Sequence, residues 1–336
     1  MPSACISQYI QEVKKLLDYF RIEKQPRRGL LAMEWVVLGY LVFTLLFILF
    51  TYTKLANPDS MIWGRMRVVA MMAALWVVYR IVPCRATIFA RVVGQMALLA
   101  WWYPDTYELN RVLPNLDHVF AQWEQALFGF QPALVFAEKF SSPVISELMS
   151  MGYAAYYPMI ACVALVYFLR HYAEFQRCIF VIMASFMAFY VIFDLVPVVG
   201  PTFYYKAAGL RHIAEGVFPN LGHYFSTHTD CLATPGYTDG IFYQMVEDAK
   251  AAGERPTAAF PSSHVGISTV CMLLLWHVRS RKLLICLLPL YVFLCMATVY
   301  IQAHYAIDAL AGLATGALFF ALFMAVSRGM VERRHR

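Results

Sequence analysis

Long apolar runs separated by short polar stretches follow one another along most of the chain. Apolar runs of about twenty residues are long enough to cross the hydrocarbon core of a membrane as helices. The pattern therefore predicts an all-α polytopic membrane protein with about eight transmembrane helices. They are expected at residues 30–52, 66–82, 86–103, 148–169, 178–196, 262–279, 283–301 and 305–327.

Composition supports a membrane protein and argues against a nucleic-acid-binding one. Of the 336 residues, 61% are hydrophobic and 14% are charged, whereas about a quarter of the residues of a soluble protein are charged. The net charge of +6 comes from basic residues at the ends of apolar runs, which is the pattern of membrane topology. We therefore expect membrane lipids as partners and no nucleic acid.

The positions of Lys and Arg predict the orientation of the chain. With eight spans, five basic clusters fall on one side of the membrane, which we take as the cytoplasmic side. One competing cluster lies in the first loop on the opposite side, at Lys54, Arg65 and Arg67. The five are the N-terminal tail, Arg80/Arg85, Arg170/Arg177, Arg279/Arg281/Lys282 and the C-terminal tail.

The same pattern divides the chain into four parts. Residues 1–29 form a cytosolic amphipathic segment with an interfacial helix at 7–24, 30–84 hold additional transmembrane helices, 85–328 form the main membrane domain, and 329–336 are a basic cytosolic tail. Within the main domain we expect an interfacial segment at 104–147 and a long outer loop at 197–261.

The first piece with candidate chemistry is His304-Tyr305-Ala306-Ile307-Asp308. In a helix over 304–327, His304 and Asp308 lie one turn apart on one face. The carboxylate then accepts the Nδ1–H of the imidazole and leaves Nε2 free as a base or nucleophile. The alternative is a His–Asp pair that only satisfies itself near the membrane surface.

The second piece is Phe260-Pro261-Ser262-Ser263-His264-Val265-Gly266. Pro261 followed by Ser262 or Ser263 is typical of a helix start, whose free N–H groups bind anions such as phosphate. The alternative is a simple cap with an incidental His264. Both pieces head helices that run in the same direction, so the spacing predicts that they meet on the non-cytoplasmic side.

These two motifs resemble signatures of the type 2 phosphatidic acid phosphatase (PAP2) superfamily, and His-Tyr-x-x-Asp is typical of its inositol phosphorylceramide synthase-like branch. The resemblance covers roughly residues 85–328. It extends weakly over Asn115-Leu116-Asp117-His118 and Val199-Gly200-Pro201. It implies a six-helix core and a lipid phosphotransferase that works through a phosphohistidine.

The resemblance also implies a role for each motif residue. His304 attacks phosphorus, Asp308 orients it, and His264 protonates the leaving oxygen and then deprotonates the acceptor. Ser262 and Ser263 hold the phosphate. No metal or organic cofactor is expected.

One part of the family pattern is absent. The Arg that phosphatases carry six residues before the second His is Thr298 here, and Asp248 stands where a Lys should precede Arg255-Pro256. The candidates for a replacement phosphate-binding cation are Arg255, ranked first, and then Lys250, Arg211 and Lys206 in the outer loop.

Three alternatives stay open. Water instead of a lipid alcohol such as ceramide as the acceptor makes the enzyme a phosphatase. His223, His228, Asp230 and Cys231 with His264 and His304 offer zinc ligands for a hydrolase, and a polytopic chain with buried polar residues also fits a lipid transporter. The expected location is a bacterial inner membrane with the site facing the periplasm, or the Golgi lumen in a eukaryote.

Overall fold

The computed structural model describes residues 17–328, which form helices and no strand. The all-α prediction is confirmed. The expected helix at 7–24 falls for the most part, and the tail 329–336 entirely, outside the described residues. The long helices are α2 (Ala32–Thr51), α3 (Pro58–Ile81), α10 (Tyr172–Leu195), α14 (Ser263–His277), α15 (Arg281–Tyr300) and α16 (Ala306–Val326).

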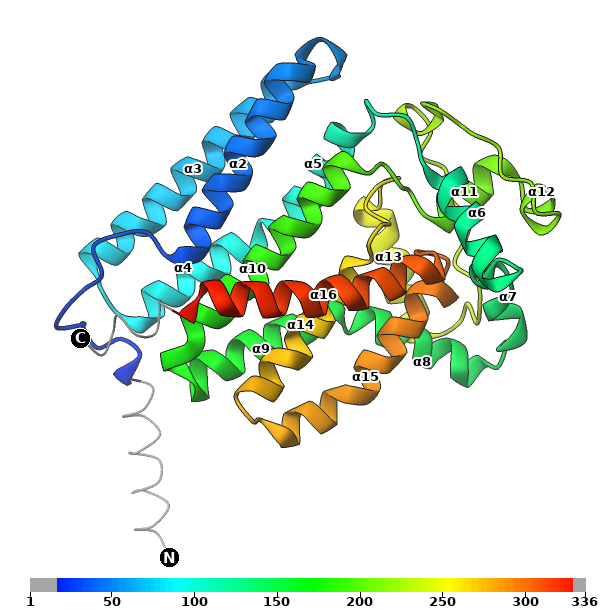
Figure 1. The fold of residues 1–336 in the computed structure, drawn as a ribbon. Coiled ribbons are helices and arrows are strands. Elements are labelled where there is room, and N and C mark those ends of the chain that lie inside the picture. Colours follow the sequence, from blue (N-terminus) through cyan, green and yellow to red (C-terminus); the bar gives the residue numbers. More distant parts are fainter. Residues whose placement is uncertain (1–16, 329–336) are drawn as a thin grey trace, which may run out of the picture.

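Shorter helices connect the long ones, and several of them gather at one end of the bundle (Figure 1). They are α4 (Arg85–Ala97), α5 (Leu99–Asn110), α6 (Asp117–Phe128), α7 (Pro132–Lys139), α8 (Pro143–Ala154), α9 (Tyr156–Arg170), α11 (Pro201–Ala208), α12 (Leu210–Ala214) and α13 (Ile241–Gly253), with 3-10 turns at Tyr52–Lys54 and Tyr224–Ser226. Figure 1 shows α6, α7, α11 and α12 at the end where α16 begins.

The prediction of about eight spans is higher than the number of helices that qualify. Five described helices are long and apolar enough to cross a membrane, and the pair α8–α9, bent by 48°, makes a possible sixth. The expected helix at 86–103 is divided between α4 and α5, because the helix is interrupted at Leu98, which ends α4 and precedes α5. The expected helix at 262–279 is α14, whose 15 residues extend about 22 Å, less than the hydrocarbon core of a typical bilayer.

Contacts place four of the expected basic clusters at one end of the bundle. The Tyr19 carbonyl accepts from the Ala86 amide at 3.0 Å, and the Arg85 guanidinium lies 4.3 Å from the Tyr172 ring. Arg177 donates to the Ser327 hydroxyl at 2.9 Å, which joins the start of α10 to the end of α16. These contacts therefore place four parts of the described chain at one end of the bundle: residues 17–29, the α3–α4 junction, the start of α10 and the last turn of α16.

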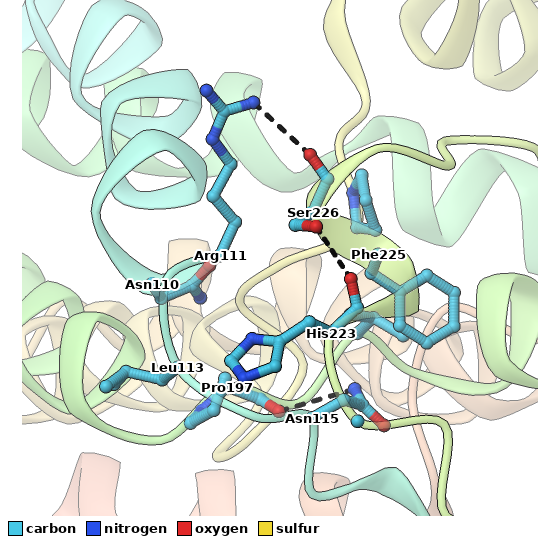
Figure 2. A pocket seen from close by; sticks show the side chains of 11 residues that line it. Asn110, Arg111, Leu113, Asn115, Pro197, His223, Phe225 and Ser226 are labelled. Atoms are coloured by element: carbon cyan, nitrogen blue, oxygen red, sulfur yellow. Dashed lines mark hydrogen bonds between the residues drawn. The ribbon is translucent and has the colours of Figure 1, made fainter. Parts of the chain in front are cut away.

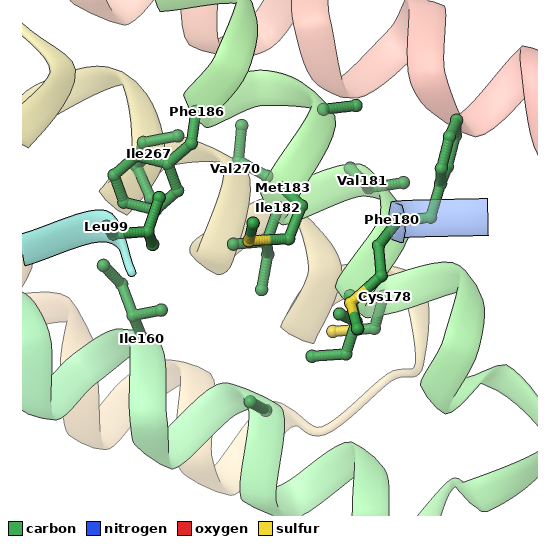
Figure 3. Close-up of a cluster of buried hydrophobic side chains, with 14 of the residues drawn as sticks. Leu99, Ile160, Cys178, Phe180, Val181, Ile182, Met183, Phe186, Ile267 and Val270 are labelled. Atoms are coloured by element: carbon green, nitrogen blue, oxygen red, sulfur yellow. The ribbon is translucent and has the colours of Figure 1, made fainter. Parts of the chain in front are cut away.

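Helix α10 forms the centre of the hydrophobic core. Residues 178–187 are all buried, so burial extends over every face of this helix, and it packs against α2, α5, α9, α14 and α16. Figure 3 shows its side chains meeting Ile160 of α9 and Ile267 of α14. A helix that is apolar on all sides is a buried one, so α10 is the element around which the others are arranged.

The closest approach of two helices in the core is between α14 and α16. A Cβ on Gly312 would lie 2.4 Å from the Ser262 carbonyl oxygen, and a Cβ on Gly316 would lie 2.4 Å from that of Gly266. Glycines spaced four apart let membrane helices touch backbone to backbone. This glycine contact brings the beginning of α14 to the beginning of α16.

The N-terminal helices are attached to the core through buried polar pairs. Arg91 of α4 and Glu34 of α2 are both fully buried, with 2.5 Å between their charged atoms. The Tyr40 hydroxyl of α2 donates to Asp194 of α10 at 3.0 Å. Removing one partner of such a pair costs about 3–5 kcal/mol because the other is left buried and unpaired.

The glycine contact gives the first prediction. Gly316→Ala forces α14 and α16 apart, because the new Cβ meets backbone that cannot turn away. We expect a loss of about 1–3 kcal/mol in the free energy of unfolding, measured by thermal or denaturant unfolding in detergent.

The matched control for this prediction is Gly39→Ala in α2, where no atom lies within 4 Å of the new Cβ. Alanine is favoured over glycine in a helix interior by roughly 0.5–1 kcal/mol, so this variant should be as stable as the native chain or slightly more stable. Equal stability of the two variants would contradict the close contact.

Candidate active site

The start of α14 matches the expected helix cap. Ser262 is buried and is the N-cap residue, and its hydroxyl accepts from the Val265 amide at 3.4 Å. Its own amide donates to the Asp308 carbonyl oxygen at 3.0 Å. The cap of α14 is therefore bonded to the first turn of α16, which places Ser263 and His264 next to the second motif.

The second motif differs from the expected helix in one important way. Helix α16 begins at Ala306, so His304 lies in the turn before it. The Asp308 carboxylate accepts from the Tyr305 amide at 2.9 Å and caps its own helix, while its Oδ2 is 3.9 Å from His304 Nδ1. The predicted hydrogen bond between His304 and Asp308 is therefore absent from this structure, because a residue outside the helix is not one turn from Asp308.

A main-chain carbonyl takes the expected place of the carboxylate. His304 Nδ1 lies 2.7 Å from the Ala259 carbonyl oxygen, and an oxygen acceptor there requires the proton on Nδ1. The Nε2 atom is then left with its lone pair free. Asp308 remains close to the ring, with its Oδ2 3.9 Å from His304 Nδ1.

The structure brings the two histidines into contact. His304 Nε2 is 3.4 Å from His264 Nδ1, and the ring centroids are 5.6 Å apart in an edge-on arrangement. Because His304 Nε2 carries a lone pair, His264 Nδ1 is the donor. The lone pair of one imidazole therefore faces the N–H of the other.

Two tyrosines that the sequence analysis did not single out hold His264. Tyr153 stacks on the imidazole with a centroid distance of 4.7 Å and an interplanar angle of 23°. Tyr156 lies 4.4 Å from it on a tilt, and its hydroxyl donates to the Ser263 carbonyl at 3.4 Å. Both come from the bend between α8 and α9. The Tyr-x-x-Tyr spacing at that bend is the only sequence signal for them.

Burial determines the charge of His304 at neutral pH. The side chain is 4% exposed, and burial lowers the pKa of His304 to about 4, although the hydrogen bond to the Ala259 carbonyl acts in the opposite direction. An unperturbed histidine titrates near 6.5. His304 is therefore neutral at pH 7, as a nucleophile has to be.

Asp117 of α6 supports the turn that carries His304. Its carboxylate accepts from the amides of Val199 and Gly200 at 2.8 and 2.9 Å and from the Tyr305 hydroxyl at 3.0 Å. Burial raises the pKa of Asp117 to about 6 in spite of these bonds. Gly200 has φ +88°, and a Cβ there would meet the Ala303 carbonyl at 2.5 Å. The weakly matching stretches at 115–118 and 199–201 thus lie directly behind His304.

Glu124, two helical turns further on in α6, faces the beginning of α16. Its Oε2 accepts from the Ile307 amide at 3.3 Å, whereas its Oε1 is buried without a hydrogen-bond partner in the described structure. Burial raises the pKa of Glu124 to about 7. The carboxylates of Asp117, Glu124 and Asp308 are therefore all used on backbone N–H groups and hydroxyls around α16.

The four candidate phosphate-binding cations differ in burial. Arg211 is 90% exposed in its side chain and pairs with Glu215, and Lys206 and Arg255 are also exposed. Lys250 has a side chain that is 11% exposed and lies 3.7 Å from Glu247. None of the four is bonded to His264 or His304 in the described structure.

Lys250 is the least exposed of the four candidates. Its ammonium is buried without a hydrogen bond in the described structure and lies 3.7 Å from Glu247. Arg255 is exposed, and its guanidinium donates to the neighbouring carbonyl of Glu254. Which of the four binds the phosphate stays a prediction.

The position of the missing arginine is next to His304. Thr298 is fully buried near the end of α15, and its carbonyl accepts from the His304 amide at 2.9 Å. Its hydroxyl donates back to the Cys295 carbonyl at 2.9 Å. Thr298 therefore supports the turn through its main chain and offers no charge to a phosphate.

A separate polar pocket lies between the end of α5 and the outer loop (Figure 2). Asn110, Arg111, Asn115, His223 and Ser226 are among its lining residues, and its cavity of about 10 Å³ is at the lower limit for one water molecule.

The zinc hypothesis has no ligand set in the described part of the chain. No three His, Cys, Asp or Glu side chains there are placed to hold a metal ion. His228 stacks on Tyr224 at 4.0 Å, and His223 lines the small pocket in Figure 2.

The chain was also compared with known proteins. A family model described as PAP2 superfamily matches residues 118–322. This range contains both histidines, Asp308 and Glu124. It leaves out α2 to α5 and starts one residue after Asp117. The chain matches no curated protein and no solved structure.

The burial of His304 gives the second prediction. Burial disfavours protonation of the ring in the folded protein, so the pH at which His304 is half protonated should be near 4 rather than near 6.5. This titration is followed by nitrogen NMR of histidine-labelled protein in detergent. The His304 signal is assigned by its loss in a His304→Asn variant. A midpoint between 6 and 7 for the signal lost in His304→Asn would show that the ring is solvated.

Proposed function

The chain belongs to the PAP2 superfamily, and from that premise we propose that it is a lipid phosphotransferase that moves a phospho-headgroup to a lipid alcohol. A phosphatase or phosphotransferase type of activity on lipids is common to the superfamily. The finer assignment, an inositol phosphorylceramide synthase-like enzyme, rests on His-Tyr-x-x-Asp and on the uncharged Thr298. The observation that carries the chemistry is the contact of His304 Nε2 with His264 Nδ1.

The first step is attack by His304 on the phosphorus of the donor lipid. The Nδ1 proton is held by the Ala259 carbonyl, so the Nε2 lone pair forms the new P–N bond. The P–O bond to the lipid alcohol breaks, and the leaving oxygen takes the Nδ1 proton of His264, which enters the step as the imidazolium beside the phosphate anion and leaves it as the neutral ring. Asp308, 3.9 Å from His304 Nδ1, stabilises the positive charge that appears on the phosphorylated ring.

The second step reverses the roles. The now unprotonated His264 accepts the proton of the incoming alcohol, whose oxygen forms a new P–O bond while the P–N bond breaks. Both steps depend on position and on neutralisation of the phosphate oxygens. The first turn of α14 contributes backbone N–H groups and the hydroxyl of Ser263 to those oxygens.

The 3.4 Å contact between the histidines is too short to hold a phosphoryl group between them. Substrate binding therefore separates the two rings. Tyr153 and Tyr156 pack against the His264 ring and hold it in place. The edges of His264 and His304 that face each other are left free for the phosphate.

The acceptor is tested with purified protein, a phosphatidylinositol donor labelled in the headgroup phosphate, and ceramide. We expect a new phosphorylated lipid only when ceramide is present, and acid-labile phosphate on the protein when it is omitted. Free inositol phosphate without ceramide, and no new lipid with it, would make the enzyme a hydrolase.

Substitutions of the two histidines test which residue acts in each step of the transfer. His304→Ala should give neither trapped phosphate nor product. His264→Ala should lower turnover by about 10²–10⁴-fold and still allow slow labelling of His304. Labelled phosphate on His304→Ala would remove His304 as the nucleophile.

The phosphate-binding cation gives a separate prediction. Lys250→Gln should lower kcat/KM by about tenfold or more, because a charge-assisted contact to a phosphate is lost. Arg255→Gln and Arg211→Gln are the controls, and both should remain within about twofold, as expected for solvated charges. A larger loss in Arg255→Gln than in Lys250→Gln would restore the original ranking.

A further inference from the structure

A groove lies on the membrane-facing side of the bundle, away from the histidines. It has a volume of about 320 Å³, within the size range of small-molecule sites. Val36 and Gly39 of α2 form one wall, Ala184 and Val191 of α10 form the floor, and Val326 of α16 closes it. Helix α2 lies outside residues 118–322, so the matched core alone does not form this groove.

The lining fits a hydrocarbon chain. Apart from Tyr40 every lining residue is apolar or glycine, and the Tyr40 hydroxyl already donates to Asp194. The groove therefore offers no free hydrogen-bonding group. Phe180 and Val191, both in the lining, are eleven residues apart on α10, so the groove runs about 16 Å along that helix. It is thus an elongated apolar slot.

The surroundings decide what fills this slot. Helices α2, α10 and α16 are all candidate spans, and residues beside the groove on α2 and α16, such as Val42 and Leu322, are exposed and apolar. The groove therefore opens toward the interior of the bilayer, where the available molecules are lipid chains.

The charge at one end of the groove favours an anionic headgroup. Val326 is followed by Ser327 and the exposed Arg328, and the exposed Arg28 lies just before α2. Arg177 donates to the Met324 carbonyl and the Ser327 hydroxyl. Of the acidic groups described at this end, Glu174 is paired with Arg177 at 3.3 Å, Glu23 accepts from the Tyr79 hydroxyl, and Asp18 is outnumbered by the basic residues. This end therefore keeps an excess of positive charge at headgroup level.

We propose that the groove between α2, α10 and α16 binds one anionic phospholipid, with an acyl chain along α10 and the headgroup at Arg28 and Arg328. The lipid belongs to the leaflet at the C-terminal end of α16. His304 precedes the other end of that helix, and the 21 residues of α16 extend about 31 Å. The bound lipid is therefore distinct from a substrate whose headgroup is at the histidines.

The experiment measures lipid binding without reference to activity. The purified protein in detergent is titrated with phosphatidylglycerol or with phosphatidylcholine of the same chains, and bound lipid is counted by native mass spectrometry. The melting temperature is followed in parallel, since a ligand of the folded state raises it. We expect one saturable phosphatidylglycerol per chain and weaker binding of phosphatidylcholine.

Variants then test the two parts of the site. Gly39→Phe fills the groove, where nothing lies within 4 Å of a new Cβ, and should weaken phosphatidylglycerol binding by about tenfold or more. The matched control is Leu49→Phe, on the exposed surface of the same helix and about 15 Å further along it than Gly39, which should bind as the native chain does. Arg28→Gln with Arg328→Gln should remove the preference for phosphatidylglycerol over phosphatidylcholine.

The results that would overturn the lipid-binding proposal differ from those that would overturn the proposed function. Equal binding by Gly39→Phe and the native chain, or equal binding of the two lipids by the native chain, would overturn the proposal. If Gly39→Phe does not fold, the smaller Gly39→Leu replaces it with the same expected loss. Because none of these residues is near the histidines, loss of lipid binding with intact phosphoryl transfer, or the reverse, tells the two proposals apart.

Discussion

Direct backbone contact between α14 and α16 is the constraint on which the candidate site depends. The two histidines are forty residues apart in sequence, and neither helix positions them alone. Gly266, Gly312 and Gly316 remove the side chains that would hold the helices apart, so the Ser262 amide reaches the Asp308 carbonyl. In lipid there is no hydrophobic drive for helices to associate, and close packing of this kind takes its place.

Once the helices are joined, the turn before α16 is fixed mainly by main-chain bonds. The His304 amide is bonded to Thr298, and its ring is bonded to the Ala259 carbonyl. Asp117 then connects Tyr305 to the Val199–Gly200 turn. The main chain at Ala259 is itself held by the bond from its amide to the Val198 carbonyl, so its carbonyl defines the tautomer of His304 more rigidly than a flexible carboxylate does. The carboxylates around this turn hold the scaffold, which explains why three of them can lie so close together.

The sequence predicted what depends on local pattern. The cap at Ser262 and the convergence of the two motifs follow from helix-start chemistry and from the direction of the runs. The partner of His304 could not be predicted, because whether α16 begins at residue 304 or 306 decides it, and helix ends are the least certain part of any pattern. Tyr153 and Tyr156 lie inside an apolar run, where they are indistinguishable from core aromatics. Lys250 and Arg255 looked alike because burial depends on the fold of the outer loop.

The helices outside the family match are connected to the site by polar contacts. The Asp194 carboxylate that accepts from Tyr40 of α2 follows Phe193, whose carbonyl accepts from Asn110 at 3.1 Å. The same amide nitrogen of Asn110 donates to Thr257 at 2.5 Å, two residues before the Ala259 carbonyl that holds His304. Buried polar pairs contribute little net stability but do specify one arrangement among several. The N-terminal helices therefore form the groove wall and also fix, through Asn110, the segment that sets the tautomer of His304.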